Sequence, residues 1–261
     1  MGKAMRNKKL GQNFLLDKNI LNKELKNANV LDSEIVLEIG GGKGVLTEVL
    51  LKKAKKVICI EIDKKLVLHL KEMFENEIKL GKLELIEGDC LKVKIPYFDK
   101  CVANIPYSLS SPLIFHLLKF KKPLYLMMQK EFAERLFTGK GERSYSALSA
   151  VCSIYFEGKI CFIVSKHVFR PKPKVDSAFV YLCPKEKIIV KKEDEKEFID
   201  FLHKIFCHKK QNLKKNILAT GICSKEEIEK IQDDFDLSKK VYHCDVEEIY
   251  EIYKKIKKNK N

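Results

Sequence analysis

Short apolar runs alternate with helical patterns from residue 34 onward. Five of these runs have the length and composition of buried strands: 35–39, 57–62, 83–87, 100–104 and 123–128. Apolar residues at three- and four-residue spacing, which indicate helices, occupy 45–53, 64–75 and a segment starting near residue 112. Such alternation predicts an α/β fold, with a mostly parallel sheet and helices on both of its faces.

Two further runs, near 161–164 and 178–182, are joined by a proline-rich segment and suggest an antiparallel pair at one edge of this sheet. Beyond Pro184 the pattern becomes lysine- and glutamate-rich, with helical periodicity and no strands. Ser224 and Glu227 have the spacing of a capping box at a helix start. We therefore expect two domains, a Rossmann-like domain at 1–184 and a small all-helical domain at 185–261.

The charge of the chain adds a partner to this picture. A formal net charge of +15 and a pI near 9.2 favour an anionic partner, most often nucleic acid. Residues 1–184 hold 32 Lys and Arg against 20 Asp and Glu, and residues 185–261 hold 19 against 16. The excess is therefore +12 in the first part and +3 in the second. The alternative is a generally lysine-rich surface without a partner.

Cysteine usage and hydropathy exclude several classes of protein. The nine cysteines are scattered singly and form no C-x-x-C pair. Zinc ribbons need closely spaced pairs of cysteines, and secreted disulfide-bonded proteins usually contain an even number of them. No apolar run reaches the roughly 18 residues of a membrane span, and no apolar segment follows the basic N-terminus. We expect a cytoplasmic protein with free thiols and no metal site.

A glycine loop, E-I-G-G-G-K-G at 38–44, follows the first predicted strand and opens the first helix. Glycine there allows a sharp turn and a close approach of the backbone to a ligand. Glu61 ends the second strand about 20 residues later, where nucleotide-binding folds place a ribose-binding carboxylate. Taken alone, a glycine-rich turn of this kind also occurs for packing.

Two more carboxylates decide which nucleotide fits. Glu38 precedes the loop and suits a cationic group better than a pyrophosphate, for example the ammonium of S-adenosylmethionine. Asp89 ends the third strand and can accept a hydrogen bond from an adenine amino group. Together they favour an S-adenosylmethionine site at the carboxyl ends of parallel strands. A nicotinamide-dependent oxidoreductase on the same fold is the competing reading, which Glu38 and the missing G-x-G-x-x-G disfavour.

The stretch V-A-N-I-P-Y-S at 102–108 ends the fourth strand at the same edge. The Asn104 side-chain oxygen and the Ile105 carbonyl can accept the two protons of an exocyclic amine, which frees its lone pair for attack on a methyl group. Pro106 fixes the path of the backbone, and Tyr107 offers a ring on which a base can stack. The alternative is an ordinary strand-to-helix turn with Tyr107 in the core.

In this order the motifs closely resemble the KsgA-type ribosomal RNA adenine N6,N6-dimethyltransferases over nearly the whole chain. L-G-Q-N-F-L-L-D at 10–17 is similar to the family's cofactor-capping motif, and V-F-R-P-K-P-K-V-D-S at 168–177 to its target-site loop. The resemblance implies a class I S-adenosylmethionine-dependent methyltransferase fold with a helical RNA-binding domain. It further implies dimethylation of two adjacent adenosines near the 3′ end of small-subunit rRNA during ribosome biogenesis, by a monomer acting on a pre-ribosomal particle.

The resemblance also implies residue roles. The cofactor pocket would be lined by Gln12, Asn13, Leu15, Gly40, Gly42, Glu61, Ile62, Asp89, Cys90 and Asn104. The catalytic group would be Asn104, Ile105, Pro106 and Tyr107. The RNA would contact Tyr107, Phe169, Arg170, Lys172, Lys174, Lys209 and Lys210. The basic residues around Phe169 indicate phosphate contact independently of the resemblance.

Two alternative functions remain open. The macrolide-resistance methyltransferases share these motifs but modify large-subunit RNA. The segment 206–218 resembles the basic motif of the small-subunit enzymes, although Lys209 and Lys210 replace an arginine pair and Gln211 replaces the next basic residue. A ribosome-assembly factor for which methylation is secondary is the other alternative.

Overall fold

The computed structural model describes residues 13–260 and divides into two compact units. The first unit extends to Ala133 and includes Gly158–Pro184, and the second consists of Glu134–Glu157 and Lys185–Asn261. The expected boundary at Pro184 is one of the boundaries between the units. Residues 134–157 differ from the expectation, because they pack with the C-terminal helices rather than with the sheet.

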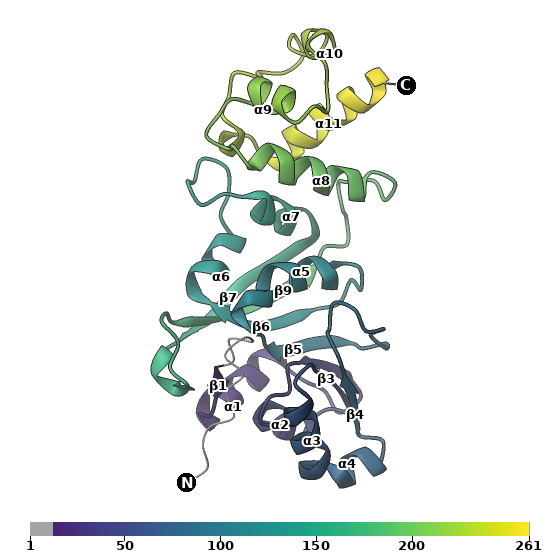
Figure 1. Ribbon diagram of the computed structural model, residues 1–261, viewed down its shortest axis with the longest axis vertical. Coiled ribbons are helices and arrows are strands. Elements are labelled where there is room, and N and C mark those ends of the chain that lie inside the picture. The colour runs from purple at the N-terminus through teal and green to yellow at the C-terminus, as the bar shows by residue number, and fades with distance from the viewer. Residues whose placement is uncertain (1–12, 261) are drawn as a thin grey trace. The chain divides into compact units, whose positions relative to one another are not determined.

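The first unit is built on a seven-stranded sheet with the order β4-β3-β2-β5-β6-β9-β7 (Figure 1). Its strands are β2 (Ile35–Ile39), β3 (Lys56–Glu61), β4 (Leu83–Glu87), β5 (Lys100–Asn104), β6 (Leu124–Gln129), β7 (Phe156–Val164) and β9 (Ser177–Pro184). Strands β2 to β6 run parallel, and β9 is antiparallel to β6. The α/β prediction is confirmed, and the two runs expected at one edge are β9 and β7.

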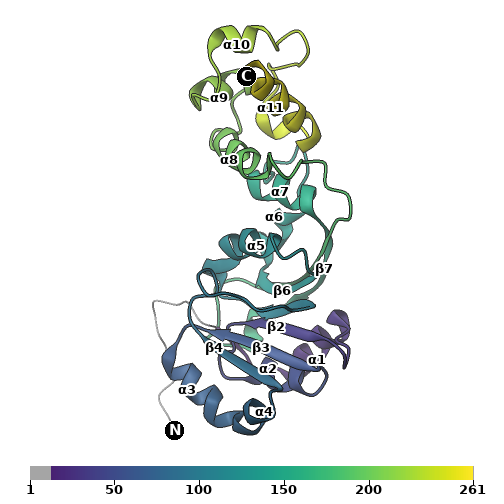
Figure 2. The ribbon, with the colours of Figure 1, turned by 90° about the vertical axis from the view of Figure 1, so that its right-hand side faces the viewer.

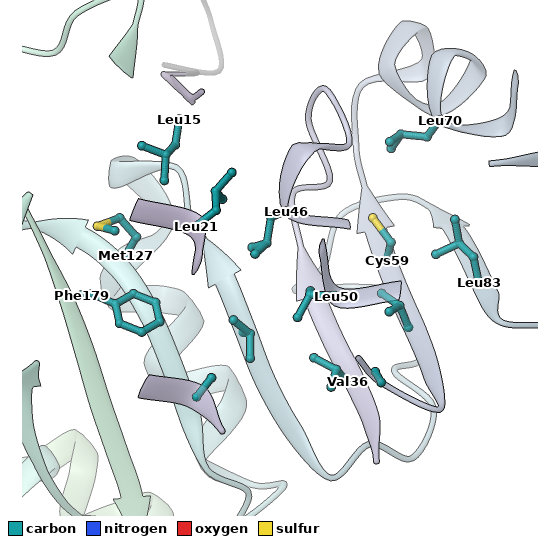
Figure 3. Close-up of a cluster of buried hydrophobic side chains, with 14 of the residues drawn as sticks. Leu15, Leu21, Val36, Leu46, Leu50, Cys59, Leu70, Leu83, Met127 and Phe179 are labelled. Carbon is teal, nitrogen blue, oxygen red and sulfur yellow. The ribbon is translucent and has the colours of Figure 1, made fainter. Parts of the chain in front are cut away.

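Helices α1 (Lys18–Ala28), α2 (Val45–Leu51) and α3 (Lys64–Met73) pack on one face of this sheet. Side chains from these helices, including Leu21, Leu46 and Leu70, join Val36 and Cys59 of the strands in one apolar cluster (Figure 3). Aspartate side chains cap the first turns of α1 and α3 by accepting hydrogen bonds from backbone N–H groups. The remaining helices are α4 (Glu75–Lys79), α5 (Ser110–Leu118) and α6 (Lys130–Leu136), and the last of these runs from the first unit into the second.

A buried lysine closes the C-terminal end of α1. The Lys100 ammonium donates to the carbonyl oxygens of Ala28 and Asn29 at 2.9 and 3.0 Å and pairs with Glu34 at 3.0 Å. The Lys100 side chain is only 10% exposed. Lys100 therefore satisfies carbonyls that an α-helix leaves without partners at its end.

We expect Lys100→Met to lower the free energy of unfolding by about 3 kcal/mol, because it leaves a half-buried carboxylate and two carbonyl oxygens without their partner. Urea denaturation followed by circular dichroism measures this change. Lys52→Met is the matched control, since the Lys52–Glu48 pair is exposed and its loss should change stability by less than about 0.5 kcal/mol. Equal effects of the two substitutions on the free energy of unfolding would contradict the stabilising role given to Lys100.

The second unit is helical, as expected (Figure 2). Its helices are α7 (Ala147–Tyr155), α8 (Glu195–Phe206), α9 (Leu213–Ala219), α10 (Lys225–Glu229) and α11 (Val246–Lys260). The capping box of Ser224 and Glu227 is present at the start of α10. Aromatic rings of α8 and α11, among them Phe198 and Tyr250 with centroids 4.9 Å apart, form the centre of its core.

Helix α7 belongs with these helices because nearly all of its side chains are buried, so it needs cover on every side. The preceding loop is fixed to the same unit by the Tyr145 ring, which packs edge-on against Phe206 at 5.2 Å. Within residues 13–260, no helix is both long and apolar enough to cross a membrane.

Candidate active site

One pocket of the first unit lies at the carboxyl ends of β2, β3 and β5. Nine of the ten expected cofactor residues line it: Asn13, Leu15, Gly40, Gly42, Glu61, Ile62, Asp89, Cys90 and Asn104. The tenth, Gln12, lies outside the described residues. Ile105, Pro106, Tyr107 and Phe169 line the same pocket, so the two sites expected from the sequence form one continuous cavity.

The glycine loop forms the floor of this pocket by a backbone path that only glycine adopts easily. Gly40, Gly42 and Gly44 have φ angles of 80°, 56° and 79°, all in the left-handed region. The Glu61 carboxylate fixes the loop, since Oε2 accepts from the Gly42 N–H at 2.9 Å and Oε1 accepts from the Asp63 N–H at 2.9 Å. Each oxygen retains a lone pair for a ligand hydroxyl.

Glu38 is a buried carboxyl group with one oxygen still unsatisfied. Its Oε2 accepts a hydrogen bond from Thr47 Oγ1 at 2.7 Å, whereas Oε1 has no hydrogen-bond partner in the part of the chain that the structure describes. Burial, together with the charge of Glu61, raises the pKa of Glu38 to about 8. A buried acceptor without a donor is costly, so this oxygen is well suited to a cationic N–H group entering the pocket.

The loop after β4 contributes Asp89 and Cys90 to the pocket. Asp89 Oδ1 accepts from the Leu91 N–H at 3.0 Å, which holds the carboxylate at the pocket wall. Burial, and next the charge of Asp89, raises the pKa of the Cys90 thiol to about 11. Cys90 therefore stays protonated at neutral pH and is a wall of the pocket rather than a nucleophile.

The end of β5 places the expected catalytic residues at the opposite side of the pocket. Asn104 Oδ1 has no hydrogen-bond partner among residues 13–260, while Nδ2 donates to Glu24 Oε2 at 3.4 Å. Pro106 has φ −58° and ψ 132°, so the chain stays extended before the short 3-10 turn η2 (Tyr107–Leu109). The Tyr107 hydroxyl is hydrogen-bonded to Ser177 Oγ at 2.7 Å, which fixes the ring at the pocket wall.

A short two-stranded sheet brings the two distant expected motifs together. Strand β1 (Phe14–Leu15) pairs antiparallel with β8 (Phe169–Arg170), so that Leu15 lies opposite Phe169. Without the resemblance, the segment 10–17 predicts a polar loop before a helix, whereas its residues Phe14 and Leu15 form a strand and line the pocket. Phe169 is buried and lines the pocket.

The basic residues expected to contact RNA fall into two groups. In the first unit, Arg170, Lys172 and Lys174 are exposed on the loop that follows Phe169. In the second unit, Lys210 is exposed, but the Lys209 ammonium donates to the carbonyl oxygens of Arg143 and Tyr145 at 2.6 and 2.7 Å. Lys209 thus holds the loop before α7 in place.

The pocket also contains residues that the sequence did not single out as site residues. They include Phe14, Leu21, Gly41, Lys43, Val45, Ser108 and Met127. Phe14 is the most informative of them, because a Cβ atom at Gly42 would meet its ring at 3.2 Å. No signal in the sequence pointed to it, since strands place successive residues on opposite sides and the assignment of Asn13 and Leu15 to the pocket points Phe14 away from it.

Comparisons with known proteins identify the family of the chain. The sequence model of the family described as "Ribosomal RNA adenine dimethylase" matches residues 4–258. A protein of Methanococcus aeolicus named "Probable ribosomal RNA small subunit methyltransferase A" is 38% identical, over 97% of this chain and 99% of its own length. A protein of the same name from Pyrococcus abyssi is 37% identical, over 94% of this chain and 90% of its own.

A solved structure gives the same result in three dimensions. The crystal structure of a dimethyladenosine transferase from Plasmodium falciparum superposes with a TM-score of 0.78 at 33% identity, covering 93% of this chain and 98% of that one. The fold is therefore that of the class I S-adenosylmethionine-dependent methyltransferases, and the resemblance noted from the motifs is confirmed. The chain belongs to the ribosomal RNA adenine dimethylase family.

Proposed function

We propose that this chain transfers methyl groups from S-adenosylmethionine to N6 of two adjacent adenosines near the 3′ end of small-subunit rRNA, dimethylating each during ribosome biogenesis. One observation carries the proposal. The pocket that contains the glycine loop, Glu61 and Asp89 also contains Asn104 with an unpartnered side-chain oxygen. A methyl donor and an amine acceptor can therefore meet in a single cavity.

The residues of the pocket fit S-adenosylmethionine group by group. Glu61 has a lone pair on each oxygen for the ribose hydroxyls, and Asp89 lines the same pocket and can accept from the adenine amino group. The unsatisfied Oε1 of Glu38 supplies the acceptor that an ammonium requires. When bound, the cofactor supplies an electrophilic methyl group on a sulfonium.

The amine of the target must be made nucleophilic by the protein. The N6 lone pair of adenine is delocalised into the ring, so the free amine attacks poorly. The Asn104 oxygen and the Ile105 carbonyl each accept a hydrogen bond from one amine N–H and favour a pyramidal nitrogen, whose lone pair forms the new N–C bond as the sulfonium S–C bond breaks. Pro106 presets the direction of that carbonyl by its fixed φ angle. Orientation and hydrogen bonding supply the acceleration.

The target base is held by aromatic side chains. Tyr107 and Phe169 line the pocket near the amine acceptors, and a base stacked on an aromatic ring gains roughly 1–3 kcal/mol. An adenosine must leave its stack to reach them, which a single-stranded loop allows at the lowest cost. Lys172, Lys174 and Lys210 are exposed and available for phosphates. Arg170 is also exposed, but its Nη1 donates to the carbonyl oxygens of His167 and Phe169, so Nε and Nη2 are its remaining donors for a phosphate. Lys209 drops out of this set, because its ammonium is held by backbone carbonyls.

Small-subunit rRNA is favoured over large-subunit RNA because both curated relatives described above are named as small-subunit methyltransferases. No disulfide bond joins the cysteines of residues 13–260, which supports a reducing compartment such as the cytoplasm. We retain the monomer as the working form of the protein.

The raised pKa of Glu38 predicts that cofactor binding is linked to pH. Below pH 8 the free carboxyl holds a proton, whereas an ammonium beside it favours the carboxylate. Binding at pH 7 should therefore release about 0.9 proton per site, and affinity should rise by up to about tenfold per pH unit between pH 6 and 7.5. Calorimetry in buffers of different ionisation enthalpy measures both effects.

Glu38→Gln is the control for this titration, because it keeps the shape of the side chain and removes its proton. In this variant the proton release and the pH dependence should disappear. Heats that are independent of the buffer in the original chain would contradict the role given to Glu38.

The ligand class itself is tested by titrating the protein with S-adenosylmethionine and, separately, with NAD. We expect saturable binding of the first and none of the second at equal concentrations. Binding of NAD alone would overturn the proposed function and favour an oxidoreductase.

A further inference from the structure

Helix α1 carries a carboxyl group on its buried face. Leu21, Glu24 and Ala28 lie on that face and are 1%, 0% and 0% exposed. Glu24 Oε1 has no hydrogen-bond partner within the described residues. A carboxyl group among apolar side chains is costly, so its presence calls for a compensating role.

The contact that Glu24 makes is with the proposed catalytic amide. Glu24 Oε2 accepts a hydrogen bond from Asn104 Nδ2 at 3.4 Å, across 80 positions of sequence. Burial raises the pKa of Glu24 well above its usual range, and the nearby charge of Glu38 adds to this. A carboxylate can only accept and so requires Nδ2 at this contact, whereas a protonated carboxyl group accepts from Nδ2 through its carbonyl oxygen while its O–H points elsewhere.

The consequence concerns the two ends of the Asn104 side chain. An amide can rotate to exchange its oxygen and its NH₂ group, and only one arrangement offers an acceptor to the target amine. With Nδ2 held by Glu24, the buried Oδ1 of this pocket-lining residue is left without a partner among the described residues. The contact thus selects the orientation that methyl transfer requires.

We propose that Glu24 is a positioning residue that holds the Asn104 amide with its oxygen toward the target amine. This inference rests on the proposed role of Asn104. It gives the buried carboxyl group a function that packing alone does not supply.

The test compares Glu24→Met with Glu24→Gln, using S-adenosylmethionine and under-methylated small subunits. Methionine fills a similar volume without an acceptor, so kcat should fall about tenfold. The Kd for S-adenosylmethionine should be unchanged, and the melting temperature unchanged or higher, because a buried carboxyl group has been removed. Glutamine keeps an acceptor of the same reach and should retain kcat within about threefold.

A double variant separates positioning from a general structural effect. Glu24→Met added to Asn104→Ala should slow the reaction no further than Asn104→Ala alone, since Glu24 acts only through that amide. Full activity of Glu24→Met, beside an inactive Asn104→Ala, would overturn the positioning role while leaving the proposed function intact. Full activity of Asn104→Ala would instead remove the proposed role of Asn104. If the methionine variant fails to fold, Glu24→Leu takes its place, and loss of folding in both would overturn the proposal.

Discussion

Replacing Asn104 with alanine is expected to lower kcat for methyl transfer roughly 10²- to 10³-fold, the size of effect seen when one preorganised hydrogen-bond partner of a reacting group is lost. The reason is the unpartnered Oδ1, which is the acceptor available for an amine proton at the end of β5. The proposed cofactor contacts are made mainly by Glu61, Asp89 and the glycine loop. Its Kd should therefore change only a few-fold, as calorimetry alongside single-turnover methyl transfer would show.

Asn104→Asp is the chemical control for this prediction. Aspartate keeps an acceptor oxygen at the same position but removes the Nδ2 donor that contacts Glu24. It should retain more activity than the alanine variant. An alanine variant that transfers methyl groups at the original rate would show that the end of β5 is an ordinary strand-to-helix turn.

Glu61→Ala is expected to weaken S-adenosylmethionine binding by about 100-fold or more. The carboxylate accepts from two backbone N–H groups at 2.9 Å and would also accept from the ribose, and each hydrogen bond to a charged group contributes about 1.5–3 kcal/mol. Its removal takes away the ribose acceptors and also the support of the loop at Gly42. Titration calorimetry measures the loss.

Glu61→Gln is the matched variant, and its binding should lie between the original chain and the alanine variant, because the amide keeps one acceptor. Unchanged affinity in Glu61→Ala would remove Glu61 from the cofactor site. The same variant addresses the assembly-factor alternative. If it binds precursor subunits and supports their maturation without methylation, methyl transfer is secondary; failure of both functions counts against that alternative.

Much of the sheet and the pocket could be predicted from local patterns. The bounds of β2, β4 and β5 agree with the predicted runs, because each is a short apolar segment with polar or turn-forming neighbours. Parallel strands end at one edge of a sheet, so residues predicted at those ends converge without any knowledge of the tertiary structure. This is why Glu61, Asp89 and Asn104 could be placed together.

The parts that could not be predicted depend on pairing between distant segments. Strands β1 and β8 have two residues each, too few for a periodic signal. Their pairing brings Leu15 and Phe169 together at the pocket. Helix α7 lies between strands in the sequence, but the other residues of the second unit cover its apolar side chains. Glu24 looks like a solvent-facing charge in a polar helix until the position of Asn104 is known.

The most direct test of the central claim is to map methyl groups on RNA. The protein is incubated with labelled S-adenosylmethionine and under-methylated small subunits, and the modified nucleotides are identified by mass spectrometry and primer extension. We expect N6,N6-dimethylation of two adjacent adenosines near the 3′ end of small-subunit rRNA, and we expect the Asn104→Ala variant to lack this modification. Methyl groups on large-subunit RNA only, or none on either RNA despite bound cofactor, would contradict it.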